Sequence, residues 1–126
     1  MTNSAPHSIF IVDSHPWVLR ALSQLIQYQT DFIVDQMSTD WRTLVVEQSN
    51  LCPDVILLDW ESPGIGRAVL NRIRAVLAHV KIIAMGVWLS SRRNALAAGV
   101  DGFISKTDSP EQVLAVLRRV GQSEIT

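Results

Sequence analysis

The chain has 126 residues, of which 48% are hydrophobic and 18% are charged, and its formal net charge at pH 7 is -1. At about 150 residues per domain, this length predicts one domain and excludes a second folded module. The single cysteine, Cys52, excludes an intramolecular disulfide and a zinc site built from cysteines. We therefore expect a single domain over residues 1–126, with its core at about residues 8–121.

The charge balance and the apolar pattern also narrow the class of protein. No apolar run approaches the ~18 residues of a membrane span, and the single cysteine suits a reducing compartment, so we expect a soluble, cytoplasmic protein with no membrane contact. Affinity for nucleic acids comes from clustered Lys and Arg, so a net charge of -1 argues against direct nucleic-acid binding.

Short apolar segments of strand length alternate with longer segments of helical period along the chain. This alternation is typical of βαβ units around a parallel sheet. The predicted strands span residues 9–12, 32–37, 55–58, 81–85 and 102–105. Three of them are nearly all apolar, as expected for strands covered on both faces. The pattern therefore predicts an α/β fold.

The segments between the strands predict amphipathic helices. The first buried stripe consists of Val18, Leu22, Leu25 and Ile26. The second consists of Val69, Leu70, Ile73, Val76 and Leu77. Less regular patterns predict helices over 41–48 and 91–98, the second of them followed by Gly99 as a left-handed terminator.

The last predicted helix has the clearest start. Ser109 is an expected N-cap, Pro110 suits the first helical position, and Gln112 completes a capping-box pattern. Its buried side consists of Val113, Leu114, Leu117 and Val120. We interpret residues 121–126 as a frayed tail or the start of a linker.

Four residues follow the predicted strands: Asp13, Asp59, Gly86 and Lys106. In an open parallel sheet the carboxyl ends of the strands share one edge, where ligands bind. The sequence therefore predicts that two carboxylates and one ammonium converge at this edge.

Three segments of the chain carry a family resemblance: IFIVDSHPWVLRALSQLI, PDVILLDWESPG and ALAAGVDGFISKTDSPEQVLAVLRRV. They resemble the receiver domains of bacterial two-component response regulators, especially the subfamily that usually carries a downstream helix-turn-helix DNA-binding module. The resemblance spans nearly the whole chain. It implies a flavodoxin-like, three-layer αβα fold with a doubly wound five-stranded parallel sheet of order 2-1-3-4-5.

The resemblance also implies the roles of single residues. Asp59 corresponds to the aspartate that accepts a phosphoryl group from a histidine kinase, and Lys106 to the lysine that contacts the phosphoryl oxygens. Asp13, Asp59 and the backbone carbonyl of Glu61 correspond to ligands of Mg²⁺. The chemistry is consistent, because phosphoryl transfer to a carboxylate requires cations to neutralise the charge that builds on the phosphoryl oxygens.

The sequence departs from the family pattern at two positions of this site. Ser14 replaces the second residue of the usual acidic pair, and a hydroxyl is a poorer Mg²⁺ ligand than a carboxylate. Gly86 stands where the family has the Ser or Thr that bonds the phosphoryl group, whereas Phe103 matches the aromatic switch position. We therefore predict an atypical receiver with weak Mg²⁺ binding and weakened switching.

The expected partner is a histidine kinase or another signalling protein, and a homodimer is a further candidate. Trp88 and Leu89 follow the fourth strand, near the surface that such receivers use for contacts. Trp88 is interpreted either as an interface residue or as a side chain that packs over the site. His15 could border the metal site, but a helix-capping or solvent-facing role is the favoured interpretation.

Two rival functions remain open at this stage. The first is a fully functional, phosphorylated receiver that controls a downstream DNA-binding domain. The second is an aspartate-nucleophile phosphatase, which generally needs a second Asp two residues after the nucleophile, where this chain has Glu61. The leading interpretation is a signalling module rather than an enzyme.

Overall fold

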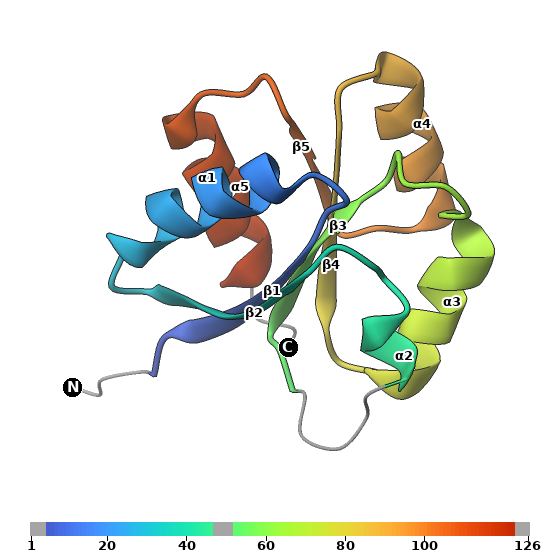
Figure 1. Ribbon diagram of the computed structural model, residues 1–126, viewed down its shortest axis with the longest axis horizontal. Helices are drawn as coiled ribbons and strands as arrows, with labels where there is room; N and C mark the ends of the chain where they lie inside the picture. Colours follow the sequence, from blue (N-terminus) through green and yellow to red (C-terminus); the bar gives the residue numbers. More distant parts are fainter. Residues whose placement is uncertain (1–4, 47–51, 123–126) are drawn as a thin grey trace.

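The computed structural model describes residues 5–46 and 52–122 as a three-layer α/β fold (Figure 1). Five parallel strands form one sheet in the order β2-β1-β3-β4-β5. They are β1 (His7–Val12), β2 (Phe32–Ser38), β3 (Val55–Asp59), β4 (Lys81–Gly86) and β5 (Gly102–Ser105). The fold class, the strand order and all the predicted strands are confirmed, with small extensions at the strand ends.

The described helices cover both faces of this sheet. They are α1 (Pro16–Gln27), α2 (Thr43–Val46), α3 (Arg67–Val76), α4 (Leu89–Ala98) and α5 (Pro110–Gly121). Helices α1 and α5 lie on one face, and α2, α3 and α4 lie on the other (Figure 1). Within the described part of the chain, none of these helices has the length and apolar character that a membrane span requires.

The sheet separates two apolar clusters. On one face Ile11 and Leu57 pack with Val18 and Leu22 of α1 and with Leu117 of α5. On the other face Ile56 and Leu58 of β3 belong to a cluster with α3 and α4. Every residue of β3 is buried, because this strand lies at the centre of the sheet and helices cover both of its faces.

Helix boundaries differ from the sequence expectation at three places. The helix expected over 41–48 is α2, Thr43–Val46, and the last residues of that expectation lie outside the described ranges. Helix α4 begins at Leu89 rather than at Ser91. Gly121 belongs to α5 rather than to a frayed tail, since it is buried where a Cβ atom would lie 3.1 Å from Val55.

The second helical stripe is only partly buried. Val69, Leu70 and Ile73 face the core, but Val76, the last residue of α3, is 39% exposed. Leu77 lies just beyond the helix and is partly buried against the same cluster. The buried face of α3 therefore ends at Ile73, although the apolar pattern in the sequence continues to Leu77.

Helix α5 begins with the predicted capping box. The Gln112 backbone N–H donates to Ser109 Oγ at 3.2 Å, and the Ser109 backbone N–H donates to Gln112 Oε1 at 2.8 Å. Pro110 occupies the first turn, where its missing N–H costs nothing. At the end of α4, Gly99 has φ 103°, a left-handed conformation that favours glycine.

The capping box gives a stability prediction. We expect Ser109→Ala to lower the free energy of unfolding by about 1 kcal/mol, because two backbone N–H groups of the first turn lose their partners or their geometry. Urea unfolding followed by circular dichroism measures the change. Ser109→Asp is the control, since aspartate also caps helices, and equal losses in both variants would contradict the assignment.

Candidate functional site

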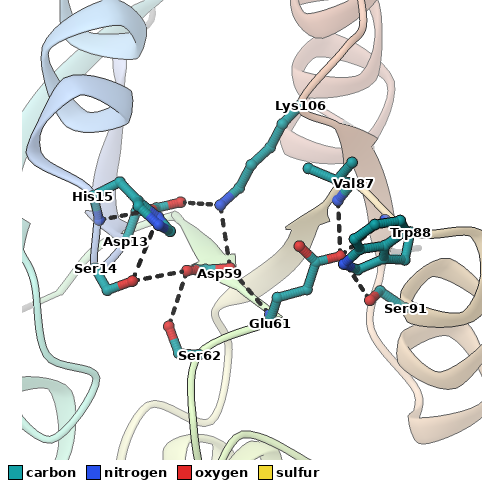
Figure 2. A network of polar contacts seen from close by, with 10 residues as sticks. All are labelled: Asp13, Ser14, His15, Asp59, Glu61, Ser62, Val87, Trp88, Ser91 and Lys106. Carbon is teal, nitrogen blue, oxygen red and sulfur yellow. Dashed lines mark hydrogen bonds and ion pairs between the residues drawn. The ribbon is translucent and has the colours of Figure 1, made fainter.

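Three charged side chains meet at the carboxyl edge of the sheet (Figure 2). Asp13 follows β1, Asp59 is the last residue of β3, and Lys106 follows β5. Lys106 Nζ lies 2.8 Å from Asp13 Oδ2 and 3.3 Å from Asp59 Oδ1. The convergence of two carboxylates and one ammonium that the strand ends predicted is confirmed.

This cluster is almost closed to solvent. Asp13 is 0% exposed, Asp59 is 1% exposed, and the Lys106 side chain is 9% exposed. Burial alone would lower the pKa of Lys106, but the hydrogen bond to Asp13 and the charges of both carboxylates outweigh it, so the pKa is raised. The ammonium therefore stays charged at neutral pH, and its contribution to stability is lost only as the pH rises through that raised pKa.

Hydrogen-bond donors surround the Asp59 carboxylate. The Glu61 backbone N–H donates to Oδ1 at 3.0 Å, Ser62 Oγ donates to Oδ2 at 2.9 Å, and Ser14 Oγ donates to Oδ2 at 3.4 Å. Ser62 was not among the residues predicted from the sequence. A hydroxyl residue three positions after an aspartate at a strand end is typical of a turn bonded by the aspartate, and this signal could have found it.

Asp13 has a second partner in His15. The His15 backbone N–H lies 2.9 Å from Asp13 Oδ1, and the ring atom Nδ1 lies 3.0 Å from the same oxygen. The His15 side chain is 55% exposed and makes no capping hydrogen bond to α1. The interpretation of His15 as a side-chain cap is therefore wrong, while its exposure fits the solvent-facing role and its contact with Asp13 places it at the border of the acidic pocket.

The Glu61 side chain leaves the pocket and reaches α4 (Figure 2). Its Oε2 accepts hydrogen bonds from the backbone N–H groups of Val87 at 2.8 Å and Trp88 at 2.9 Å, and from Ser91 Oγ at 2.7 Å. Burial would raise the pKa of Glu61, but these hydrogen bonds and the Lys106 charge together lower it. An ionised carboxylate thus occupies the N-terminus of α4, where the helix dipole favours a negative charge.

Gly86, the last residue of β4, lies directly against this carboxylate. A Cβ atom at position 86 would lie 2.6 Å from Glu61 Oε2 and 3.0 Å from Glu61 Cδ. The Glu61 carboxylate therefore occupies the space that a side chain at position 86 would need. The sequence analysis considered only the backbone carbonyl of Glu61 as a metal ligand, and no sequence signal indicates where its side chain points.

The remaining predicted residues lie on the α4 side of the site. Phe103 of β5 is 8% exposed and belongs to the apolar cluster that includes Ala95 and Ala98 of α4. Trp88 and Leu89 are 66% and 63% exposed. The interpretation that Trp88 packs over the site is therefore wrong, and Leu89 is the first residue of α4.

Comparison with known families fits this arrangement. The family model described as a response regulator receiver domain matches residues 9–118. The chain belongs to this family. The resemblance drawn from the three sequence segments is thus confirmed.

Curated relatives of this chain include proteins of Escherichia coli and Salmonella typhimurium. The nitrate/nitrite response regulator protein NarL of Escherichia coli is 29% identical over 99% of this chain and 59% of its own length. The fimbriae Z protein of Salmonella typhimurium is 32% identical over 80% of this chain and 50% of its own. The receiver chain thus spans little more than half the length of these curated relatives.

Solved structures share the fold of this receiver at lower sequence identity. A LuxR-family two-component response regulator from Aurantimonas has a TM-score of 0.81 at 21% identity, covering 93% of this chain and 86% of its own. The receiver domain of a sensor histidine kinase from Pseudomonas aeruginosa has a TM-score of 0.78 at 23% identity, covering 94% of this chain and 100% of its own. That structure holds a magnesium ion in its active-site cleft.

The buried ion cluster gives a second stability prediction. In Lys106→Met, two buried carboxylates lose their cation, and Asp13 Oδ2 has no hydrogen-bond donor among the described residues to replace the ion pair. We expect the free energy of unfolding at pH 7 to fall by about 3 kcal/mol. Chemical denaturation measures it, with Lys81→Met as the control outside the cluster. A loss no larger than that of the control would contradict the prediction.

Proposed function

We propose that this receiver accepts a phosphoryl group on Asp59 and that its magnesium binding and its switching are weakened relative to the family pattern. The observation that supports the first part is the Lys106 ammonium, which lies within 3.3 Å of Asp59 and within 2.8 Å of Asp13. A buried ammonium beside a carboxylate nucleophile stabilises the negative charge that develops on a transferred phosphoryl group.

The bonds of the proposed transfer balance between Asp59 and the donor. An Asp59 oxygen attacks the phosphorus of a phosphohistidine on a histidine kinase, the P–N bond breaks as the P–O bond forms, and the imidazole takes up a proton. Lys106 Nζ is in reach of the phosphoryl oxygens. The Ser62 hydroxyl and the Glu61 N–H orient the Asp59 carboxylate for the attack.

The residues of the pocket fit a divalent cation, with a reduced set of ligands. Asp13 and Asp59 offer two buried carboxylates, the Glu61 carbonyl is the further candidate ligand, and Ser14 offers a neutral hydroxyl where a second acidic residue would stand. Mg²⁺ prefers charged oxygen ligands, and when bound it would neutralise charge on the phosphoryl oxygens. We therefore propose that Ser14 lowers the affinity for Mg²⁺.

The weakened switching rests on Glu61 and Gly86. The Glu61 carboxylate already bonds the first turn of α4, and Gly86 has no hydroxyl that could bond a phosphoryl group. The connection that a hydroxyl at position 86 would make on phosphorylation is therefore absent. In its place, a hydrogen-bonded contact between the Asp59 loop and α4 exists without a phosphoryl group.

We further propose that the output passes through protein contacts at the exposed Trp88 and Leu89. Large apolar residues exposed side by side are typical of protein interfaces. A histidine kinase or another signalling protein is the expected partner, with self-association as an alternative.

The hydrogen bonds between Glu61 and α4 argue against the phosphatase alternative. A general acid must be free to reach the leaving group, and the Glu61 carboxylate is held by α4 instead.

Beryllofluoride, which mimics a phosphoryl group on aspartate, tests this function. With ¹⁵N-labelled protein, saturating Mg²⁺ and beryllofluoride, we expect NMR shifts at Ser14, Glu61 and Ser62 but none at Phe103 or in α4, because the contact with α4 is already made. Asp59→Asn is the negative control, in which all these shifts should disappear.

A triple variant supplies the opposite control. Ser14→Asp, Gly86→Ser and Glu61→Ala together restore the acidic pair and a hydroxyl, and remove the carboxylate that fills its space. We expect this variant to bind Mg²⁺ at least about tenfold more tightly and to carry the shifts to Phe103. If the unchanged chain already binds Mg²⁺ as tightly as the variant and carries the shifts to Phe103, the proposed weakening of magnesium binding and switching is wrong. The alternative of a fully functional receiver is then correct.

A further inference from the structure

The pocket offers a nitrogen ligand on the side that Lys106 does not occupy (Figure 2). Lys106 pairs with Asp13 Oδ2 and Asp59 Oδ1. The other oxygens, Asp13 Oδ1 and Asp59 Oδ2, lie toward Ser14 and His15. One ligand atom from each of Asp13, His15 and Asp59 lies within 4.8 Å of the other two.

We propose that this pocket binds a first-row transition-metal dication, such as Mn²⁺, Co²⁺ or Zn²⁺, in preference to Mg²⁺, with Asp13, His15 and Asp59 as its ligands. The proposal rests on the proposed function in one respect, namely that the acidic pocket is a cation site with reduced affinity for Mg²⁺. It adds the identity of the preferred cation and a ligand that the proposed function does not use.

The positions of the ligand atoms are compatible with a shared ion. Ligand atoms about 2.1 Å from a metal ion and at right angles to one another are about 3.0 Å apart, and at tetrahedral angles about 3.4 Å apart. His15 Nδ1 lies 3.0 Å from Asp13 Oδ1, whereas Asp59 Oδ2 is connected to His15 Nδ1 through Ser14 Oγ, which lies 3.4 Å from both atoms. One ligand atom from each of Asp13, His15 and Asp59 lies within 4.8 Å of the other two, so side-chain rotations would bring the three atoms onto one ion.

The donor chemistry decides which ion the pocket prefers. Imidazole nitrogen suits Zn²⁺ and its first-row neighbours, whereas Mg²⁺ requires oxygen ligands in nearly octahedral geometry. Ser14 removes a charged oxygen ligand and His15 supplies the adjacent nitrogen. Affinity at mixed nitrogen and oxygen sites rises from Mn²⁺ through Co²⁺ along the first row, so the exchange moves the preference away from Mg²⁺.

The surroundings hold the ligands in position. Asp13 and Asp59 are buried and each accepts at least one hydrogen bond, so their carboxylates are fixed. The hydrogen bond from the His15 backbone to Asp13 keeps the imidazole beside that carboxylate. Among the residues that the structure describes, Asp13, His15 and Asp59 are the group of three His, Cys, Asp or Glu side chains whose ligand atoms lie within 4.8 Å of one another.

Cation titration of the whole chain tests the proposal. Isothermal titration calorimetry with Mg²⁺, Mn²⁺, Co²⁺ and Zn²⁺ measures the affinities, and visible absorption of the Co²⁺ complex reports nitrogen ligation. We expect Co²⁺ and Zn²⁺ to bind at least about tenfold more tightly than Mg²⁺. His15→Gln should remove at least about tenfold of the Co²⁺ affinity, alter the absorption bands and change the Mg²⁺ affinity by a smaller factor. His79→Gln, at an exposed histidine, is the matched control.

Ser14→Asp separates this proposal from the proposed function. This substitution should raise the Mg²⁺ affinity and reduce the difference between the Co²⁺ and Mg²⁺ affinities. If Co²⁺ binds the unchanged chain no more tightly than Mg²⁺, or if His15→Gln and His79→Gln have equal effects, the role of His15 is wrong while the weak magnesium site stands. If instead Ser14→Asp does not raise the Mg²⁺ affinity, the proposed weakening itself fails.

Discussion

The Lys106 ammonium between two buried carboxylates is the contact on which the site depends. Asp13 and Asp59 end two neighbouring strands, β1 and β3, and both are almost fully removed from water. Two buried carboxylates repel each other and have lost their hydration, and a nearby cation offsets both costs. The parallel topology supplies one, because β5 ends at the same edge and the lysine side chain reaches past β4 to both carboxylates.

The same edge explains why the loop after Asp59 is tied to α4. The Glu61 N–H donates to Asp59, and the carboxylate of the same residue accepts hydrogen bonds from the first turn of α4. Gly86 leaves room for the Glu61 side chain, because a Cβ atom at position 86 would lie 2.6 Å from Glu61 Oε2. One residue thus joins the candidate phosphoacceptor to the helix that presents Trp88 and Leu89 to solvent.

The sequence predicted the sheet and the charged cluster because both follow from simple periodic rules. Apolar runs mark β3 and β4, and residues after parallel strands share an edge, which brings Asp13, Asp59 and Lys106 together. The Glu61 contact could not be predicted, since it depends on a side-chain rotamer and on the distance between two loops that are far apart in sequence. The start of α2 was predicted at Trp41 rather than at Thr43, because the sequence pattern there is weak and tertiary packing sets where the helix begins.

The departures from the family pattern at Ser14 and Gly86 both lie beside the candidate phosphoacceptor. At position 14 a hydroxyl stands in place of a carboxylate and lies 3.4 Å from His15 Nδ1. At position 86 the glycine leaves the space that the Glu61 carboxylate occupies. A contact that forms only with a phosphoryl group reports its presence, whereas the Glu61 contact with α4 exists without one. Phosphorylation could therefore be reported through Glu61 only by breaking this contact. Three hydrogen bonds to a partly buried carboxylate oppose that change, and this opposition is the physical basis of the proposed weakening of the switch.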